Sequence, residues 1–360
     1  MPDDLILRRA LNILRRPSGG QESLPGDTSP APERVSMLYE HARAASGLAA
    51  ESRLSRLDAA RAEFAAALLE EGRGALAEVA AKGLAASLTT SQSSGLEAIV
   101  RLTGRPSLLI QDGTFAQTTH EWNEPLLAAR AQIDNVLTRV GRVNLPEIGS
   151  PGYVGTAFLA GADLALTNRH VAMLFAQSHQ DGWRTRTGYT PSVDVQAEHD
   201  RPGRQEHRVL DIVDIHPDPL VDLAILRLAP QSSSGSRLPA PLALNSDRAR
   251  IAVGRQVYVI GYPAYDPRND ASVMNQIFGN VFFVKRLAPG EIIGAREQGL
   301  QLTHDCSTLG GNSGSCVIDF STHRVLGLHF SGIYLEENRA ASIAHLDDDP
   351  IVSGRGLNYV

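Results

Sequence analysis

From residue 141 onward, the sequence consists of short apolar runs separated by Gly, Pro and Asp. These runs occupy residues 156–159, 164–167, 224–226, 256–260, 281–284 and 325–328. Short runs with turn residues between them are typical of β-strands, and a long series of them indicates a barrel or a sandwich. We therefore expect a mainly β domain in the second part of the chain.

The part of the chain before residue 141 has a helical composition. Residues 35–82 are rich in Ala, Leu, Arg and Glu, which are strong helix formers. One set of residues recurs there at helical spacing and predicts a buried face, namely Leu54, Leu57, Ala60, Phe64 and Leu68. Gly72 and Gly74 interrupt this pattern, so we expect one helix to end near them and another to begin.

An extended run and a further helix are expected between these helices and the β domain. Residues 107–110 are expected to be extended, and Asp112-Gly113 after them is a turn signal. Asn123 is expected to cap a helix that has Pro125 in its first turn. We expect this helix to dock on the first β-barrel as the chain enters it, through an apolar face formed by Leu126, Leu127, Ile133, Val136, Leu137 and Val140.

The first 34 residues predict a short basic helix and a flexible linker. Residues 5–16 place Leu7, Leu11 and Leu14 on one helical side. This helix is either a plain terminal helix, which we favour, or one that lies on an anionic membrane or in a partner's groove. The early acids and the short apolar run do not match a secretory signal, so the expected location is the cytoplasm.

Composition argues against several functional classes. A net charge of -6 gives no support for a nucleic-acid partner. The two cysteines, Cys306 and Cys316, are too few for a disulfide scaffold, and we expect two small buried side chains rather than a redox-switching disulfide. The histidines match no trusted metal-ligand spacing, so neither a metal nor a cofactor is expected.

Three short motifs in the β region carry groups that can act together on a carbonyl carbon. They are Thr167-Asn168-Arg169-His170, Val221-Asp222-Leu223-Ala224 and Gly310-Gly311-Asn312-Ser313-Gly314. A serine hydroxyl becomes a nucleophile only when a base within hydrogen-bond reach removes its proton. The chain order His, Asp, Ser is one of three unrelated orders that converge on this chemistry.

In this order and spacing, the three motifs resemble the trypsin-like (chymotrypsin-fold) serine proteases, and within them the bacterial branch that includes the glutamyl endopeptidases. The resemblance covers residues 141–346. It implies two antiparallel six-stranded β-barrels, at about 141–230 and 241–346, preceded by an α-helical region. The expected domains are therefore 1–34, a helical accessory or regulatory region at 35–140, the protease domain at 141–346 and a C-terminal tail at 347–360.

The family resemblance implies a serine endopeptidase that works through an acyl-enzyme. Ser313 is then the nucleophile, His170 the base and later the acid, and Asp222 the group that orients the imidazole. The backbone N–H groups of Gly311 and Ser313 are expected to bind the developing oxyanion, at roughly 3 kcal/mol per donor. Asn312 stands where digestive members carry an aspartate that pairs with a newly cut N-terminal amine, so we expect no need for that activation cut.

The resemblance also suggests how a substrate is bound. Ser307 stands where trypsin-type enzymes carry a pocket-floor aspartate, which disfavours cleavage after Arg or Lys. Thr308 and His329 match a pair that binds a glutamate side chain in glutamyl endopeptidases, so Glu or Asp at P1 is one expectation. A pocket for small or apolar side chains, with His329 in its wall, is the other. Phe330-Ser331-Gly332 is expected to pair with the substrate backbone as an added strand.

Two further functional interpretations of the whole chain stay open. The barrel domain could be a latent protease effector that the helices at 35–82 hold in a sensing or signalling assembly. Those helices could also bind a protein partner or another copy of the chain. A non-catalytic peptide-binding module is disfavoured, because no member of the predicted triad is missing.

Overall fold

The structure is a computed structural model, and it describes residues 7–8, 10–11, 14, 32–45, 56–116, 122–265, 278–333 and 337–360. The chain divides into two compact units. The first consists of residues 1–106, 267–280 and 334–336, and the second of residues 107–266, 281–333 and 337–360. No helix in the described ranges has the length and apolar character needed to cross a membrane.

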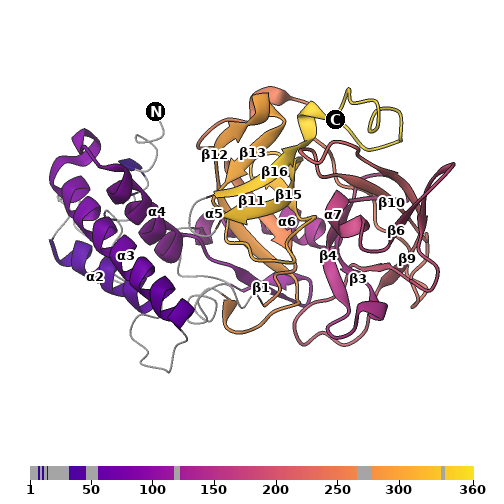
Figure 1. Cartoon of the computed structure of the whole chain (residues 1–360), viewed down its shortest axis with the longest axis horizontal. Helices are drawn as coiled ribbons and strands as arrows, with labels where there is room; N and C mark the ends of the chain where they lie inside the picture. Colours follow the sequence, from indigo (N-terminus) through magenta and orange to yellow (C-terminus); the bar gives the residue numbers. More distant parts are fainter. Residues whose placement is uncertain are drawn as a thin grey trace. The chain divides into compact units, whose positions relative to one another are not determined.

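The first unit is helical (Figure 1). Its elements are α2 (Pro32–Ala45), α3 (Arg56–Lys82), the 3-10 turn η1 (Gly83–Ala85) and α4 (Thr90–Gly104). They share an apolar core whose described members include Leu7, Leu11, Leu14, Leu38, Leu69, Leu76, Val79, Leu96 and Ile99. Leu7, Leu11 and Leu14 are buried in this core, and most other residues of the predicted helix at 5–16 lie outside the described ranges, so its role stays a prediction.

The expected helix boundary at Gly72 and Gly74 is wrong, because α3 continues through both residues. A Cβ atom on Gly72 would overlap the backbone oxygen of Gly95 in α4. Gly72 therefore serves the close approach of two helix backbones rather than a break, and the strong helix formers around it carry the helix on. Of the predicted apolar stripe, Leu54 and the side chains of the other four residues lie outside what the structure describes, as does most of the predicted linker.

The second unit contains the first predicted barrel. It is a closed ring of six antiparallel strands in the order β10-β5-β4-β3-β8-β9. In chain order these are β3 (Val140–Asn144), β4 (Tyr153–Leu159), β5 (Leu164–Thr167), β8 (Ser192–Asp194), β9 (Glu206–Ile215) and β10 (Ala224–Leu228). The helical turn α7 (Arg169–Ala172) follows β5, and a hairpin of β6 (Ala176–His179) and β7 (Gly182–Thr185) follows α7.

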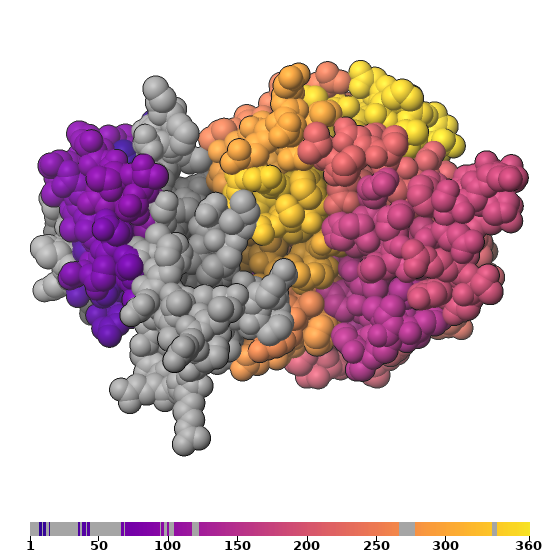
Figure 2. All heavy atoms as spheres, viewed as in Figure 1, coloured from indigo at the N-terminus to yellow at the C-terminus, as the bar shows by residue number. Residues whose placement is uncertain are grey.

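The second barrel has the strand order β11-β14-β15-β16-β13-β12, and β12 pairs back with β11 to close the ring. Its strands are β11 (Gln256–Gly261), β12 (Arg286–Arg296), β13 (Gln301–His304), β14 (Cys316–Asp319), β15 (Val325–Ile333) and β16 (Glu337–Ser342). The expected pair of six-stranded barrels is thus confirmed. In the space-filling view the two barrels, magenta to red and orange to yellow, lie directly against each other (Figure 2).

One predicted strand, at residues 281–284, is wrong. The structure begins β12 only at Arg286. Phe283 has φ 64°, a left-handed conformation that cannot continue a strand. Its N–H donates to the carbonyl of Pro263 at 2.8 Å, so this segment is held as an irregular connection in front of β12.

The segment before the first barrel belongs to the second unit. The predicted extended run and turn form β1 (Leu108–Gln111) and β2 (Thr114–Phe115), and β1 pairs with β12. The predicted helix is in fact two, α5 (Asn123–Ala128) and α6 (Arg130–Leu137), and α5 starts at Asn123 without a side-chain cap. Val140, expected on that helix, is the first residue of β3.

Three apolar clusters stabilise the second unit. Val143, Leu159 and Leu226 belong to the cluster inside the first barrel. Val259 and Leu302 belong to the cluster inside the second barrel. The third cluster joins the two barrels to α5 and α6, with members such as Leu126, Ile133, Leu137, Phe158, Leu166, Tyr258 and Ile260. The helices at 123–137 therefore pack in one cluster with residues of the first barrel, as expected, and with residues of the second barrel as well.

The cysteines and the C-terminal residues are also ordered by this packing. Cys306 lies in the core of the second barrel and Cys316 in the cluster between the barrels, so they form no disulfide. Burial raises the pKa of the Cys316 thiol to about 12. Residues 347–360 return to the barrels, where Leu357 bridges to Gly161 and Tyr359 to Leu244.

Candidate active site

His170 and Asp222 form the tightest pair of chemically useful groups in the predicted site. His170 lies in α7, one turn after β5 ends at Thr167, and Asp222 directly precedes β10. The Nδ1 atom of His170 lies 2.6 Å from Oδ2 of Asp222, and the His170 backbone N–H donates to Oδ1 at 3.0 Å. A carboxylate only accepts hydrogen bonds, so the neutral imidazole carries its proton on Nδ1, and Nε2 is the nitrogen that can accept one.

The backbone of Asp222 also binds the two residues that precede His170, Asn168 and Arg169. Asp222 has φ 46°, which an aspartate tolerates better than most residues. Its carbonyl accepts hydrogen bonds from Nδ2 of Asn168 at 2.9 Å and from the N–H of Arg169 at 3.1 Å. Asn168 is fully buried. Asn168 and Arg169 therefore fix the position of Asp222 relative to His170.

Ser313 lies on a tight loop between β13 and β14, as its glycine-rich motif predicts. Gly311 has φ 86° and Gly314 has φ 93°, backbone conformations that residues other than glycine rarely adopt. Asn312 is buried and closes the loop, since its N–H donates to the Leu309 carbonyl at 3.2 Å and its own carbonyl accepts from Ser315 N–H at 2.9 Å.

The loop presents two backbone donors. Within the part of the chain that the structure describes, neither Gly311 N–H nor Ser313 N–H donates a hydrogen bond. The carbonyl of Gly310 accepts from Ala264 N–H at 2.6 Å. In a trans peptide the next N–H points the opposite way, so Gly311 N–H points away from Ala264. Both donors are therefore unused by the described residues.

Residues of β4 connect this loop to the helix that carries His170. Gly155 lies between them: a Cβ atom there would stand 2.8 Å from Val171 Cγ2 and 3.0 Å from the Ser313 carbonyl oxygen. Thr156 N–H donates to that same carbonyl at 2.8 Å. The serine loop and α7 thus both pack on Gly155 of the first barrel.

One residue predicted for the specificity pocket, His329, forms a buried pair with a second histidine, His304. His329 is 3 % exposed, and its Nδ1 lies 3.2 Å from Nε2 of His304, the last residue of β13. Thr308 Oγ1 donates to Oδ1 of Asn338 at 2.7 Å, and Asn338 Nδ2 donates to the Cys306 carbonyl at 2.7 Å. Ser307 is half-buried in the same connection.

The segment Phe330-Ser331-Gly332 lies on an accessible sheet edge. On one side it pairs with β16, through Ser331 opposite Arg339 and Gly332 opposite Asn338. On the other side β14 begins at Cys316, opposite Leu328, and the serine loop continues the pairing to His329, whose carbonyl accepts from Gly314 N–H and whose N–H donates to the Ser315 carbonyl. Among the described residues, no strand pairs with residues 330–332 on this side. Ser331 and Gly332 are exposed. An extended peptide could add itself here as a strand.

Three buried polar residues of this region are not singled out by the sequence. They are Thr156, His304 and Asn338, each at most 6 % exposed. Thr156 has a weak signal, because it is a polar residue within an apolar strand pattern. His304 and Asn338 have none, since they reach His329 and Thr308 only through the pairing of β13, β15 and β16.

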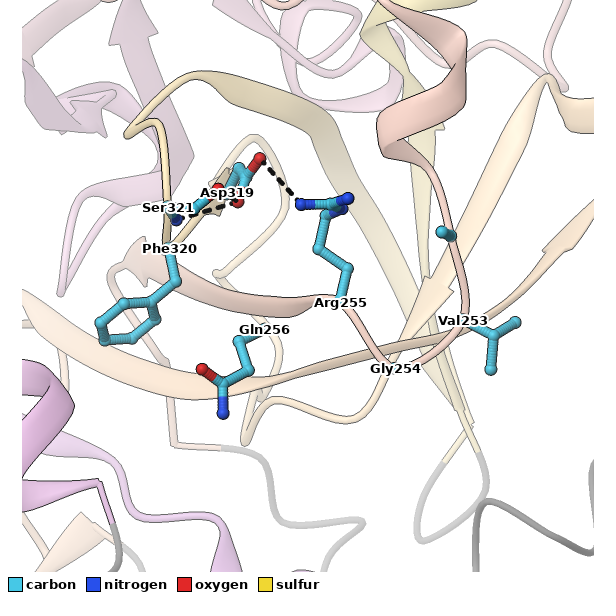
Figure 3. Close-up of a pocket in the computed structure, with 8 residues that line it drawn as sticks. Val253, Gly254, Arg255, Gln256, Asp319, Phe320 and Ser321 are labelled. Carbon is cyan, nitrogen blue, oxygen red and sulfur yellow. Dashed lines mark hydrogen bonds and ion pairs between the residues drawn. The ribbon is translucent and has the colours of Figure 1, made fainter.

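A separate hollow of about 470 Å³ opens on the second barrel (Figure 3). It is lined by residues 252–256, at the start of β11, and by Asp319, Phe320 and Ser321, at the end of β14. Ser313 precedes the other end of β14, so this hollow is not the predicted specificity pocket. Inside it, Arg255 forms an ion pair with Asp319 at 3.5 Å.

The buried histidine predicts acid sensitivity of the fold. Burial, with His304 and His170 nearby, holds the pKa of His329 well below its usual value. Below about pH 6.5 the unfolded chain protonates this histidine and the folded protein does not, so stability falls as pH falls. The slope approaches about 1.4 kcal/mol per pH unit only below pH 6.5, so we expect this residue to cost about 1.4 kcal/mol in total between pH 7.5 and 5.5, measured by urea unfolding. A His329→Gln variant should show a shallower slope, and an equal slope would contradict the assignment.

Comparison with known proteins gives this arrangement a family. Residues 155–328 match the model of the trypsin-like peptidase domain. A probable serine protease of Lysobacter enzymogenes is 33% identical over 290 residues, which cover 71% of this chain and 74% of that protein. A glutamyl endopeptidase of Staphylococcus epidermidis is 30% identical over 131 residues, which cover 35% of this chain and 38% of that protein.

Among solved structures, the active form of the Rv3671c protease of M. tuberculosis matches with 20% identity and a TM-score of 0.39. That match covers 66% of this chain and 88% of the other, a likeness too low to add to the assignment. The family model and the Lysobacter relative carry it, together with the paired barrels described above. The chain belongs to the trypsin-like serine proteases.

Proposed function

We propose that the protein is an endopeptidase whose catalytic groups are Ser313, His170 and Asp222. The observation that carries the proposal is the 2.6 Å contact between His170 Nδ1 and Asp222 Oδ2, in a helix that packs on Gly155 of β4, as the serine loop does. In the neutral imidazole this contact places the proton on Nδ1, so Nε2 is the nitrogen that can act as the general base.

The chemistry follows from these groups. Nε2 of His170 takes the hydroxyl proton of Ser313 while Oγ attacks the scissile carbonyl carbon, and Asp222 stabilises the imidazolium that results. The N–H groups of Gly311 and Ser313 bind the oxyanion. His170 then gives the proton to the leaving amine. A water molecule attacks the acyl-enzyme in turn, with His170 taking the proton of the water and returning it to Oγ of Ser313.

For substrate choice we propose a preference for Glu or Asp at P1. Because burial lowers the pKa of His329, this histidine is neutral at pH 7 and binds through an N–H rather than through a charge. If His304 Nε2 donates to His329 Nδ1, the proton of His329 lies on Nε2, ready for a substrate carboxylate. The name glutamyl endopeptidase, carried by several relatives, supports the same choice.

The pocket also sets a condition on this preference. Thr308 now donates its only hydroxyl proton to Asn338. A bound carboxylate would have to replace Asn338 as the acceptor before Thr308 could contribute. Thr308 is therefore the weaker of the two proposed contacts, and His329 the stronger.

Peptides that differ only at P1 test the preference. We expect kcat/KM for Glu to exceed that for Gln by about 10- to 150-fold, the worth of roughly 1.5–3 kcal/mol for hydrogen bonds to a charged group. In His329→Gln the Glu-to-Gln ratio should fall close to one, whereas His345→Gln, a change in a histidine bonded to Ser342, should keep it. A wild-type ratio near one, or higher activity on Ala, would support the small-residue pocket instead.

The wider expectations stay predictions. These are the cytoplasmic location, the binding of a protein partner or a second copy through the helices, and restraint of the protease in a larger assembly. A truncation that tests restraint should begin at residue 107 rather than within α6, because β1, β2, α5 and α6 belong to the second unit.

A further inference from the structure

Thr156 stands in the middle of β4 and is fully buried. β4 is a strand of the first barrel, but the bonds of Thr156 with Gly311, Ser313 and Tyr262 reach residues that precede or follow strands of the second barrel. It therefore connects the scaffold that carries His170 with the loop that carries Ser313.

The hydroxyl of Thr156 is used in both directions. Oγ1 donates to the carbonyl of Gly311 at 3.0 Å and accepts from the N–H of Tyr262 at 3.2 Å. The backbone N–H donates to the carbonyl of Ser313 at 2.8 Å, and the backbone carbonyl accepts from Thr167 Oγ1 at 2.7 Å. One residue thus binds two carbonyls of the loop that presents the oxyanion donors.

The contact of the Thr156 hydroxyl with Gly311 is one of two hydrogen bonds that hold the peptide planes on either side of this glycine. The Gly311 N–H lies in the same peptide plane as the Gly310 carbonyl. Because a glycine at φ 86° can rotate widely about φ and ψ, this plane keeps its direction best when the plane after Gly311 is held as well. The carbonyl of the first plane, Gly310 O, is held by Ala264 N–H. The carbonyl of the second, Gly311 O, is held by Thr156 Oγ1. The same hydroxyl also binds Tyr262 N–H, two residues before Ala264, and so supports the other restraint.

We propose that the Thr156 hydroxyl is a positioning group that aims the Gly311 N–H at the oxyanion. It does not touch the substrate. It acts by holding the peptide plane after Gly311, so its removal should weaken binding of the transition state more than binding of the substrate. This inference rests on the proposed function of the Ser313 loop.

The test compares Thr156→Val, which keeps the shape without the hydroxyl, with Thr156→Ser, which keeps the hydroxyl. For Thr156→Val we expect kcat to fall about 10- to 100-fold with KM within about twofold, since loss of a whole oxyanion donor costs about 10²–10³. Thr156→Ser should stay within about threefold of the natural protein. The control is Thr303→Val, a buried threonine of β13 outside the loop's hydrogen bonds.

A second measurement separates positioning from plain structural damage. A peptide aldehyde forms a hemiacetal whose oxygen occupies the oxyanion site, so its Ki should rise in Thr156→Val by the same factor as kcat/KM falls. The Ki of the corresponding product carboxylate peptide should stay within about twofold. If Thr156→Val does not fold, Thr156→Ala removes the same hydroxyl and carries the same expectation.

Three results would overturn the inference: unchanged kcat and aldehyde Ki in Thr156→Val, an equal loss in Thr156→Ser, or a loss confined to KM. The proposed function fails differently, through full peptidase activity in Ser313→Ala. The two failures are therefore distinguishable in one set of variants.

Discussion

Ser313→Ala is expected to lower kcat by about 10⁶-fold while the protein stays folded, because no other group can form the acyl bond. The same variant should lose labelling by a fluorophosphonate probe. His170→Ala should cost a similar factor, since the hydroxyl then has no base, and Asp222→Asn about 10⁴-fold, since the imidazole then takes the wrong tautomer. Peptide hydrolysis under saturating substrate measures all three.

The double variant Ser313→Ala with His170→Ala sharpens this result. Groups that act as one unit are not additive, so the double variant should be no slower than either single one. Ser178→Ala, a change at an exposed serine of β6, serves as the control and should keep full activity and labelling. Ser313→Ala with more than about a hundredth of natural activity would remove Ser313 from the mechanism.

Gly311→Ala is expected to destroy activity and to destabilise the protein as well. A Cβ atom at Gly311 would overlap the hydroxyl of Tyr153 and stand 2.7 Å from the Tyr262 carbonyl oxygen. The Tyr153 hydroxyl donates to that carbonyl, so the new methyl group displaces a buried hydrogen bond and moves the oxyanion loop. We expect a loss of at least about 10²-fold in kcat and a free energy of unfolding about 2–5 kcal/mol lower, from backbone strain plus an unsatisfied buried hydroxyl.

Gly188→Ala is the matched control for this substitution. Gly188 has the same φ of 86°, but a Cβ atom there meets nothing within 4 Å. It should therefore show only the backbone cost of about 1–2 kcal/mol, with natural activity. Equal destabilisation in the two variants, measured by urea unfolding, would show that strain rather than the contact with Tyr153 dominates at Gly311.

The errors of the sequence-based fold have specific causes. The helix break expected at Gly72 assumes that glycine ends helices, whereas this one allows α4 to approach α3. The strand expected at 281–284 depends on apolar character alone and misses the left-handed Phe283. Val140 was expected on a helix because its spacing from Val136 and Leu137 fits a helical face, and residues at the end of a helix and the start of a strand can share one core.

The amino-acid sequence alone determined the fold class, the three motifs and the family. Strand periodicity and the glycine-rich turn depend on neighbouring residues, and the order of the motifs is the order of the chain, so none of them requires knowledge of distant contacts. Even the helical turn at Pro125 and the hairpin at Asp112-Gly113 followed from local preferences. The partners of Thr156, the His304–His329 pair and the Thr308–Asn338 contact did not. They join residues 25 to 155 positions apart through strand register and barrel closure, which no local preference specifies, so only the tertiary structure decided them.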